Sequence, residues 1–129
     1  ISMHLEDDLL MANMDARLII QVLVNLINNA IKYTPENSNI SLNARRVEDK
    51  ILIEVQDDGN GVLHPDQLFE MFYTENNRGG DTRRGMGLGL SLCKSIIQSH
   101  GGTIWVENVT PHGACFKFVL DAVEVKLYE

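Results

Sequence analysis

The fold is decided by residues 21–35, QVLVNLINNAIKYTP, in which apolar side chains recur every three or four positions. This spacing predicts an amphipathic helix with a wide apolar face. Asp15 is a good N-cap in front of it, and Pro35 with the polar residues 36–39 ends it. The apolar face comprises Leu18, Ile19, Val22, Leu23, Leu26, Ile27, Ala30 and Ile31.

The same helix carries a polar face formed by Asn25, Asn29 and Lys32, which are spaced at i, i+4 and i+7. We expect this face to lie opposite the apolar one. Asparagine is a poor helix former, so a cluster that also includes Asn28 costs helix propensity. One interpretation is a solvated polar face. The other is a site where carboxamide oxygens bind a hard cation such as Mg²⁺ and the lysine binds anionic oxygens.

Outside this helix, strand and helix patterns are mixed along the chain. A second helix is expected over residues 90–100, before Gly101 and Gly102, and a short helical turn over 68–72. Residues 74–84 read as a polar loop that is long enough to be functional. Four segments alternate apolar and polar residues and are predicted strands: 40–44, 51–55, 103–106 and 114–120. Hairpins without strict βαβ units predict an α+β fold: a two-layer α/β sandwich with a mixed, mostly antiparallel sheet covered on one face by helices.

Length and composition limit the classes of function. A chain of 129 residues with 44% hydrophobic and 22% charged residues suits one globular domain, and we expect residues 1–129 to form it. The formal net charge of −7 argues against a nucleic-acid partner. No apolar run is long enough to span a membrane, so we expect no direct membrane contact. Cys93 and Cys115 form no CxxC pair and are expected to be reduced core residues, and the scattered histidines lack zinc-ligand spacing.

A second candidate site is the acidic turn Asp57-Asp58-Gly59-Asn60-Gly61, which follows a predicted buried strand. The glycines permit positive φ and let another group approach the backbone. One interpretation is an ordinary hairpin-type turn. The other places a carboxylate at the floor of a pocket, where it accepts a hydrogen bond from an amino group of a ligand, because a buried carboxylate without a partner is costly.

A third candidate is the glycine-rich run Gly85-Met86-Gly87-Leu88-Gly89-Leu90 in front of the second helix. Such a run binds phosphate through free amide groups and the helix dipole. It follows a polar loop and not a strand, and no Gly-Lys-Ser/Thr follows, so it is neither a dinucleotide fingerprint nor a P-loop. Alone it indicates only a possible phosphate site.

Taken together and in this order, the motifs resemble those of the ATP-binding domain of sensor histidine kinases, within the superfamily that includes DNA gyrase, the Hsp90 chaperones and the MutL repair proteins. The resemblance covers about residues 5–120 and leaves 121–129 outside the family pattern. It implies the Bergerat-type ATP-binding fold. The matching segments are 21–35 (N box), 57–61 (G1 box), 68–72 (F box), 85–90 (G2 box) and 113–116 (last strand).

This resemblance implies roles for residues in the first two boxes. Asn29 would ligate the Mg²⁺ that bridges the phosphates of ATP, with Asn25 close by. Lys32 would contact phosphate oxygens, and Tyr33 would lie against the nucleotide. Asp57 would accept a hydrogen bond from the adenine amino group, and the two glycines of the G1 box, Gly59 and Gly61, would give room beside the base.

The resemblance also implies that residues 74–84 form an ATP lid. Arg78, Arg83 and Arg84 are the candidates for a lid arginine, because no arginine directly follows the F box. In the G2 box, Gly85, Gly87, Leu88 and Gly89 would surround the phosphates. The last-strand position that often carries threonine, and helps a water bridge Asp57 and adenine, is matched to Cys115.

Three functions remain as hypotheses. The first is the catalytic half of a histidine kinase, which transfers the γ-phosphoryl group of ATP to a histidine on another domain. The second is a self-contained ATPase of the gyrase or Hsp90 type, but these carry a glutamate where this chain has Asn25, and asparagine cannot act as a general base. The third is an adenine-nucleotide-binding module without catalysis.

The kinase hypothesis brings expectations about partners. No histidine of this chain has the sequence context of an acceptor, so the acceptor is expected on a separate dimerisation domain of the parent kinase. A response regulator receiver domain is the second expected partner. The fragment is expected to be a cytoplasmic part of a membrane-anchored sensor, and residues 85–97 with 113–116 resemble potassium-responsive sensor kinases of the Kdp type.

Overall fold

A computed structural model of the chain describes residues 2–5, 12, 14–35, 37–70 and 88–122. It contains two α-helices, one 3-10 helix and five strands within these ranges. In chain order the elements are β1 (Ser2–Leu5), α1 (Ala16–Tyr33), β2 (Ile40–Val47), β3 (Lys50–Asp57), η1 (Pro65–Gln67), α2 (Leu88–Ser99), β4 (Thr103–Asn108) and β5 (Ala114–Asp121).

The strands form one sheet in the order β1-β2-β3-β5-β4. β1 pairs in parallel with β2, and the other neighbours are antiparallel. The predicted mixed, mostly antiparallel sheet is therefore confirmed. In this register Asp57 at the end of β3 lies opposite Ile40, and Asn108 at the end of β4 lies opposite Ala114 at the start of β5.

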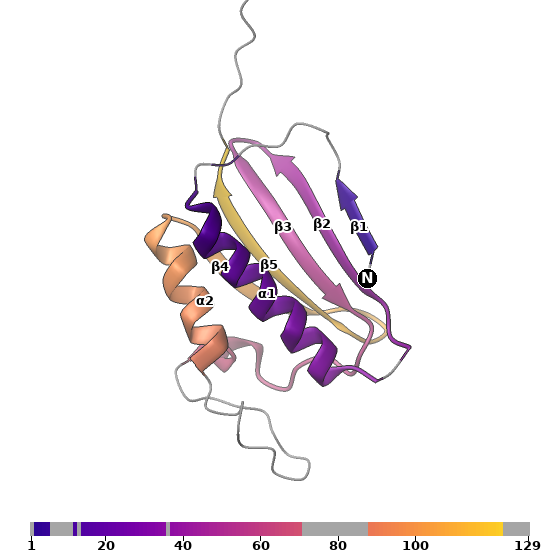
Figure 1. The fold of residues 1–129 in the computed structure, drawn as a ribbon. Helices are drawn as coiled ribbons and strands as arrows, with labels where there is room; N and C mark the ends of the chain where they lie inside the picture. Colours follow the sequence, from indigo (N-terminus) through magenta and orange to yellow (C-terminus); the bar gives the residue numbers. More distant parts are fainter. Residues whose placement is uncertain (1, 6–11, 13, 36, 71–87, 123–129) are drawn as a thin grey trace, which may run out of the picture.

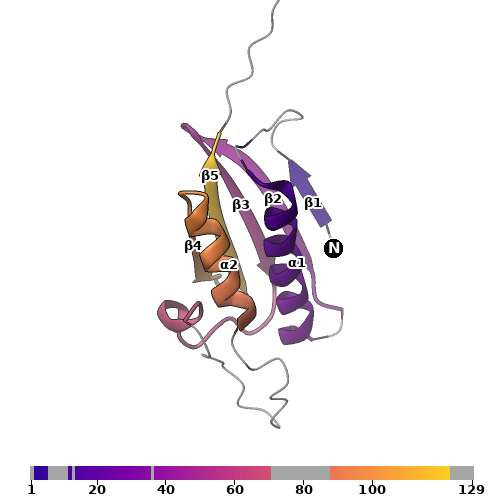
Figure 2. The same ribbon diagram turned by 60° about the vertical axis from the view of Figure 1, so that its left-hand side comes forward.

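Both α-helices cover the same face of the sheet (Figure 1; Figure 2). From α1, the side chains of Val22, Leu26 and Ala30 are buried against it. From β5, Phe116 and Phe118 fill the same layer. The two-layer sandwich predicted from the sequence is confirmed, because the apolar stripe of α1 and one face of the sheet bury each other.

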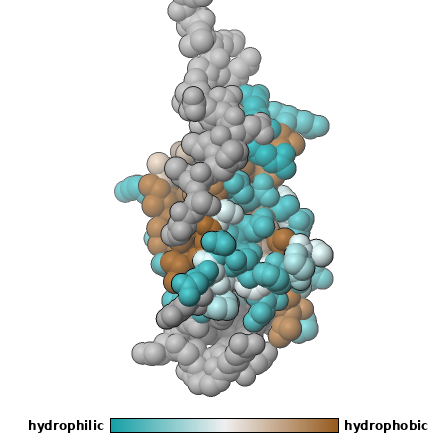
Figure 3. Space-filling model, turned by 90° about the vertical axis from the view of Figure 1, so that its right-hand side faces the viewer, coloured by the Kyte–Doolittle hydropathy of each residue, from teal (hydrophilic) through white to brown (hydrophobic). Residues whose placement is uncertain are grey.

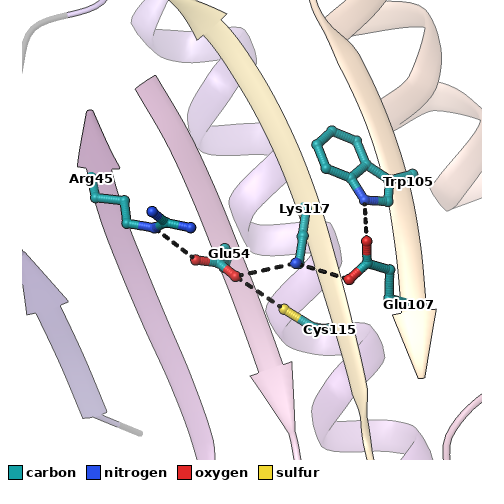
Figure 4. A network of polar contacts seen from close by, with 6 residues as sticks. All are labelled: Arg45, Glu54, Trp105, Glu107, Cys115 and Lys117. Atoms are coloured by element: carbon teal, nitrogen blue, oxygen red, sulfur yellow. Dashed lines mark hydrogen bonds and ion pairs between the residues drawn. The ribbon is translucent and has the colours of Figure 1, made fainter. Parts of the chain in front are cut away.

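The opposite face of the sheet carries a network of polar side chains (Figure 4). At its centre, Glu54 lies 3.7 Å from Nζ of Lys117, which in turn lies 2.9 Å from the carboxylate of Glu107. This pairing raises the pKa of Lys117 and lowers the pKa of Glu107, chiefly through the hydrogen bond between the two side chains. Arg45, Trp105 and Cys115 complete the network.

Local signals explain most element boundaries. The carboxylate of Asp15 caps α1 by accepting from the backbone N–H groups of Arg17 and Leu18, at 3.0 and 3.4 Å. Gly101, with φ of 74°, ends α2, as the sequence predicts.

Several boundaries differ from the sequence expectations. β2, β3 and β4 are longer than the predicted segments 40–44, 51–55 and 103–106. α2 begins at Leu88, two residues earlier than expected. The helical turn expected over 68–72 lies earlier in the chain, as the 3-10 helix η1 (Pro65–Gln67). Leu68 and Phe69 follow it and are buried. Residues 71 and 72 lie outside the described part of the chain. β5 extends through Asp121, one residue into the segment that we expected outside the family pattern.

The outer face of α1 is more apolar than expected. Ile20, Val24 and Ile31 are 58%, 45% and 53% exposed, and they lie on the side of the helix that faces away from the buried stripe. The prediction that Ile31 belongs to the apolar face is therefore wrong. Viewed from the β1 side, the coloured surface is largely hydrophilic, with its largest hydrophobic area on the left of the view and smaller ones on the right (Figure 3). Among the described residues, no helix is long and apolar enough to cross a membrane.

His100 connects the end of α2 to the start of α1. Its Nε2 accepts a hydrogen bond from the backbone N–H of Asp15 at 3.0 Å, and its Nδ1 lies 2.8 Å from the carbonyl oxygen of Ile96. A neutral imidazole with its proton on Nδ1 satisfies both contacts. The ring therefore holds the N-cap of one helix against the last turn of the other.

Replacing this ring should weaken the packing of the two helices. We expect His100→Ala to lower the free energy of unfolding by about 1–2 kcal/mol, since two hydrogen bonds of ordinary strength are lost. Urea denaturation measures the change. Gln98→Ala is the matched control, because Gln98 is exposed on the same helix, and equal losses in the two variants would contradict this role of His100.

Candidate functional site

Asp57 is the one buried charged residue in the described part of the chain, with 7% of its surface exposed. Its Oδ1 accepts two backbone hydrogen bonds, from Gly59 at 2.9 Å and from Ala114 at 3.2 Å. No described residue donates to its Oδ2. One carboxylate oxygen is thus held by the protein, while the other is a buried acceptor that calls for a donor from outside the described residues.

The glycines beside Asp57 are required by packing. A Cβ at Gly59 would lie 2.8 Å from the methyl group of Thr34, and a Cβ at Gly61 would lie 2.6 Å from Oδ1 of Asn108. Gly61 also has φ of 83°. Neighbouring protein atoms therefore exclude a side chain at either position, while the room that these glycines would give beside a base stays a prediction.

Further contacts hold the turn from outside. The carboxylate of Asp58 accepts from the backbone N–H of Asn39 at 2.9 Å, which ties the turn to the segment after α1. Nδ1 of His112 lies 2.8 Å from the carbonyl oxygen of Asp58. Sequence reasoning missed these residues, because each partner is 19 or more positions away along the chain.

The polar face of α1 does not lie opposite the apolar stripe, as we expected from the sequence. Asn25 and Asn29 are half-buried and flank the stripe, and only Lys32 is exposed. Helix geometry accounts for this. Positions four apart, such as 25 and 29, differ by about 40° around the helix axis, so the two asparagines spread toward the apolar stripe. The two asparagines thus lie at the border between the core and the surface.

The two asparagines differ in their surroundings. Oδ1 of Asn25 accepts a hydrogen bond from the side chain of Gln21 at 3.2 Å. Asn25 also contacts the thiol of Cys93 on α2, where burial raises the thiol pKa to about 11 and the Asn25 hydrogen bond opposes that shift. Asn29 makes no side-chain hydrogen bond to any described residue, so its amide oxygen is available to a ligand.

The remaining candidates lie at the end of α1, at the start of α2 or outside the described residues. Leu88 and Gly89 occupy the first turn of α2, and a Cβ at Gly89 would meet nothing within 4 Å. Tyr33 is the last residue of α1. Residues 71–87 lie outside the described part, and with them the candidates Arg78, Arg83, Arg84, Gly85 and Gly87.

Three of the predicted sites lie at one end of the molecule. The last turn of α1, the end of β3 and the first turn of α2 all lie at the lower end in Figure 1, and Figure 2 agrees. The chain thus gathers the C-terminal part of α1, which carries Asn29 and Lys32, a buried carboxylate and a helix N-terminus, which are separated in sequence. This combination suits a ligand with an amino group at one end and anionic oxygens at the other.

The prediction that Cys115 stands at the last-strand position beside Asp57 is wrong, whereas the prediction that it is a reduced, buried cysteine is confirmed. Its thiol lies on the open face of the sheet, 3.6 Å from a carboxylate oxygen of Glu54, and burial and then the Glu54 charge raise the thiol pKa to about 12. Side chains alternate along a strand, so Cys115 faces away from Asp57. Its neighbour Ala114 is the residue that contacts the Asp57 carboxylate.

The family model described as "Histidine kinase-, DNA gyrase B-, and HSP90-like ATPase" matches residues 14–124 of this chain. The chain belongs to this ATPase family. The model extends three residues past Asp121, so part of the segment expected outside the family pattern lies within it. Membership confirms the resemblance drawn from the motifs and makes the chain an ATP-binding domain.

Solved structures place this ATPase domain among histidine kinases. The catalytic domain of histidine kinase ThkA is 32% identical, with a TM-score of 0.81, and the match covers 93% of this chain and 78% of that one. ThkA in complex with the response regulator TrrA is 31% identical, with a TM-score of 0.77, over 95% of this chain and 34% of that chain. The predicted fold is therefore confirmed as that of a histidine kinase catalytic domain.

The curated relatives are much longer sensor kinases. Sensor protein KdpD of Clostridium acetobutylicum is 38% identical over 92% of this chain and 13% of its own length. The adaptive-response sensory kinase SasA of Crocosphaera subtropica is 46% identical over 82% of this chain and 28% of its own length. The chain is thus similar to a Kdp-type kinase, but its sequence identity to SasA is higher, over a shorter part of the chain.

Proposed function

We propose that this domain binds Mg-ATP and supplies the γ-phosphoryl group that phosphorylates a histidine on a separate domain of a two-component sensor kinase. The observation that carries the proposal is the buried carboxylate of Asp57, with one oxygen bound to two backbone amides and the other without a donor among the described residues. The sensor kinases among the relatives support the choice of reaction.

Adenine recognition rests on the free oxygen of Asp57. A carboxylate only accepts hydrogen bonds, so Oδ2 suits the exocyclic amino group of adenine. A base with a carbonyl oxygen at that position would face the carboxylate with a second acceptor and be rejected. Asp57 therefore selects the base, while Tyr33 at the end of α1 is assigned to contact with the nucleotide.

Asn29 suits a magnesium ion better than Asn25 does. Mg²⁺ prefers oxygen ligands, and Asn29 offers an amide oxygen that no described residue engages. The amide oxygen of Asn25 already accepts from Gln21. Bound there, the ion would neutralise negative charge on the phosphate groups of the nucleotide. Lys32 is exposed on the last turn of α1 and is assigned to the phosphate oxygens.

The phosphate end of the nucleotide is assigned to the G2 box and the lid. The 12-residue helix α2 begins at Leu88, so the free amides of Leu88 and Gly89 and the helix dipole favour an anion there. Gly85 and Gly87 belong to the same assignment. Arg78, Arg83 and Arg84 are the candidates for the lid arginine that contacts the γ-phosphate.

Transfer to histidine needs no general base on this chain. A neutral imidazole nitrogen attacks the γ-phosphorus, the bond to the β–γ bridging oxygen breaks, and ADP leaves with the electron pair. Asn25 stands where the related ATPases place a glutamate, and an amide cannot remove a proton from water. The residue at this position therefore favours phosphoryl transfer over hydrolysis.

The partners of the domain follow from this reaction. The acceptor histidine is assigned to a dimerisation domain of the parent kinase, and a response regulator receiver domain takes the phosphoryl group next. The complex of ThkA with TrrA supports the second partner. We take residues 1–129 as one ATP-binding domain of a parent that is anchored in the membrane.

The metal assignment is tested by Asn29→Ala. We expect this change to weaken Mg-dependent ATP binding by roughly 1–3 kcal/mol, the scale for contacts to charged groups. Calorimetric titration with and without Mg²⁺ separates the metal-dependent part. Asn28→Ala is the matched control, because Asn28 is the exposed neighbour on the same helix. Unchanged Mg-ATP affinity in Asn29→Ala would contradict the assignment of Asn29 as a magnesium ligand.

The kinase assignment is tested by the activity of the isolated chain. We expect it to bind ATP, to carry no label from γ-labelled ATP and to hydrolyse ATP slowly, because phosphoryl transfer depends on a positioned nucleophile. Adding the acceptor domain of the same parent should produce acid-labile, base-stable phosphate on that domain. Rapid hydrolysis by the isolated chain would instead support a self-contained ATPase.

A further inference from the structure

Asn108, the last residue of β4, binds the backbone of Val62 through both ends of its side-chain amide. The N–H of Val62 donates to Oδ1 of Asn108 at 2.7 Å, and Nδ2 of Asn108 donates to the carbonyl oxygen of Val62 at 2.9 Å. Two such bonds on one residue reproduce the pairing of an antiparallel strand. The side chain thus fixes a backbone segment 46 positions away.

This clamp holds the far end of the turn that begins at Asp57. The near end is fixed by β3, and Gly59 lies between the two ends. Gly61 is pressed against the clamp, since a Cβ there would lie 2.6 Å from Oδ1 of Asn108. Glycines have the greatest backbone freedom, so a turn with glycines at 59 and 61 needs an external restraint to keep one conformation.

Asn108 is linked indirectly to both backbone N–H groups that donate to the Asp57 carboxylate. One donor is the N–H of Gly59, which lies inside the clamped turn. The other is the N–H of Ala114, the residue opposite Asn108 in the pairing of β4 with β5. Both donors bind Oδ1, and together they set the rotation of the carboxylate and the direction of Oδ2.

We propose that Asn108 is a positioning residue for base selection: its clamp on Val62 keeps Gly59 in place and so aims Oδ2 of Asp57 at the amino group of the base. This inference rests on the proposed function, in which Asp57 contacts adenine. Hydrogen bonds weaken steeply as their angle departs from linear. Loosening the turn should therefore reduce selectivity for the amino group more than it reduces binding of the phosphates.

The test compares ADP with inosine diphosphate, which carries a carbonyl oxygen in place of the adenine amino group. Calorimetry gives the ratio of the two dissociation constants in the same magnesium buffer. We expect the wild-type chain to prefer ADP, and Asn108→Ala to reduce this preference by roughly threefold to tenfold, the worth of one hydrogen bond. The affinity for inosine diphosphate should change little.

Two further variants distinguish a positioning role of Asn108 from a general destabilisation of the fold. Glu107→Ala is the matched control, because Glu107 precedes Asn108 on β4 and loses contacts to Lys117 and Trp105 away from the turn. It should keep the wild-type ratio. Asn108→Asp has the same shape but places a second acceptor against the carbonyl oxygen of Val62, so it should also lower the ratio.

The outcomes separate the inference from the function on which it rests. A wild-type chain that binds both diphosphates equally would overturn the adenine contact of Asp57 and the positioning role with it. A wild-type chain that discriminates, with Asn108→Ala keeping the full ratio, would overturn the positioning role alone. A shifted NMR signal for the amide of Gly59 in Asn108→Ala, with the signal unchanged in Glu107→Ala, supports it.

Discussion

The hydrogen bonds that Gly59 and Ala114 donate to one oxygen of Asp57 are the interaction on which the rest of the site depends. A buried carboxylate is costly unless its oxygens find donors. Within the described part of the chain, the backbone supplies donors to Oδ1 only, and this asymmetry is what leaves Oδ2 for the amino group of a base. Selection of adenine is thus built into the backbone around the carboxylate.

The sheet is what brings these groups together. Ala114 reaches Asp57 because β5 pairs with β3, and β5 is fixed on its other side by β4. Close packing then leaves no room for a side chain at Gly113, directly before β5: a Cβ there would lie 2.2 Å from the carbonyl oxygen of Asp57. α1 and α2 cover the same face, and the end of α1 and the start of α2 lie at the end of the molecule where β3 stops (Figure 1).

Much of this fold and part of the site could be predicted from local sequence pattern. The periodicity of α1 and the alternation in β2, β3 and β5 are properties of neighbouring residues, and they located the core. Asp57 was predictable because an acidic residue between a buried strand and two glycines has few structural uses. The motif order was enough to identify the family.

The rest depends on contacts between distant residues or on the side to which a strand residue points. Asn108 and Val62 give no sign in the sequence that they bind each other. Cys115 was placed beside Asp57 because the register of β5 was unknown, and one residue changes the face of the sheet. The exposure of Ile20 on α1 could likewise not be predicted from the pattern, because apolar residues continue around the helix.

A crystal structure of this chain with a bound adenine nucleotide would test the role of Asp57 most directly. We expect the exocyclic amino group to lie within hydrogen-bond distance of Oδ2 of Asp57, about 2.7–3.2 Å, while Oδ1 keeps its bonds to the amides of Gly59 and Ala114. A base bound elsewhere, or an amino group that contacts neither oxygen of Asp57, would contradict the central claim.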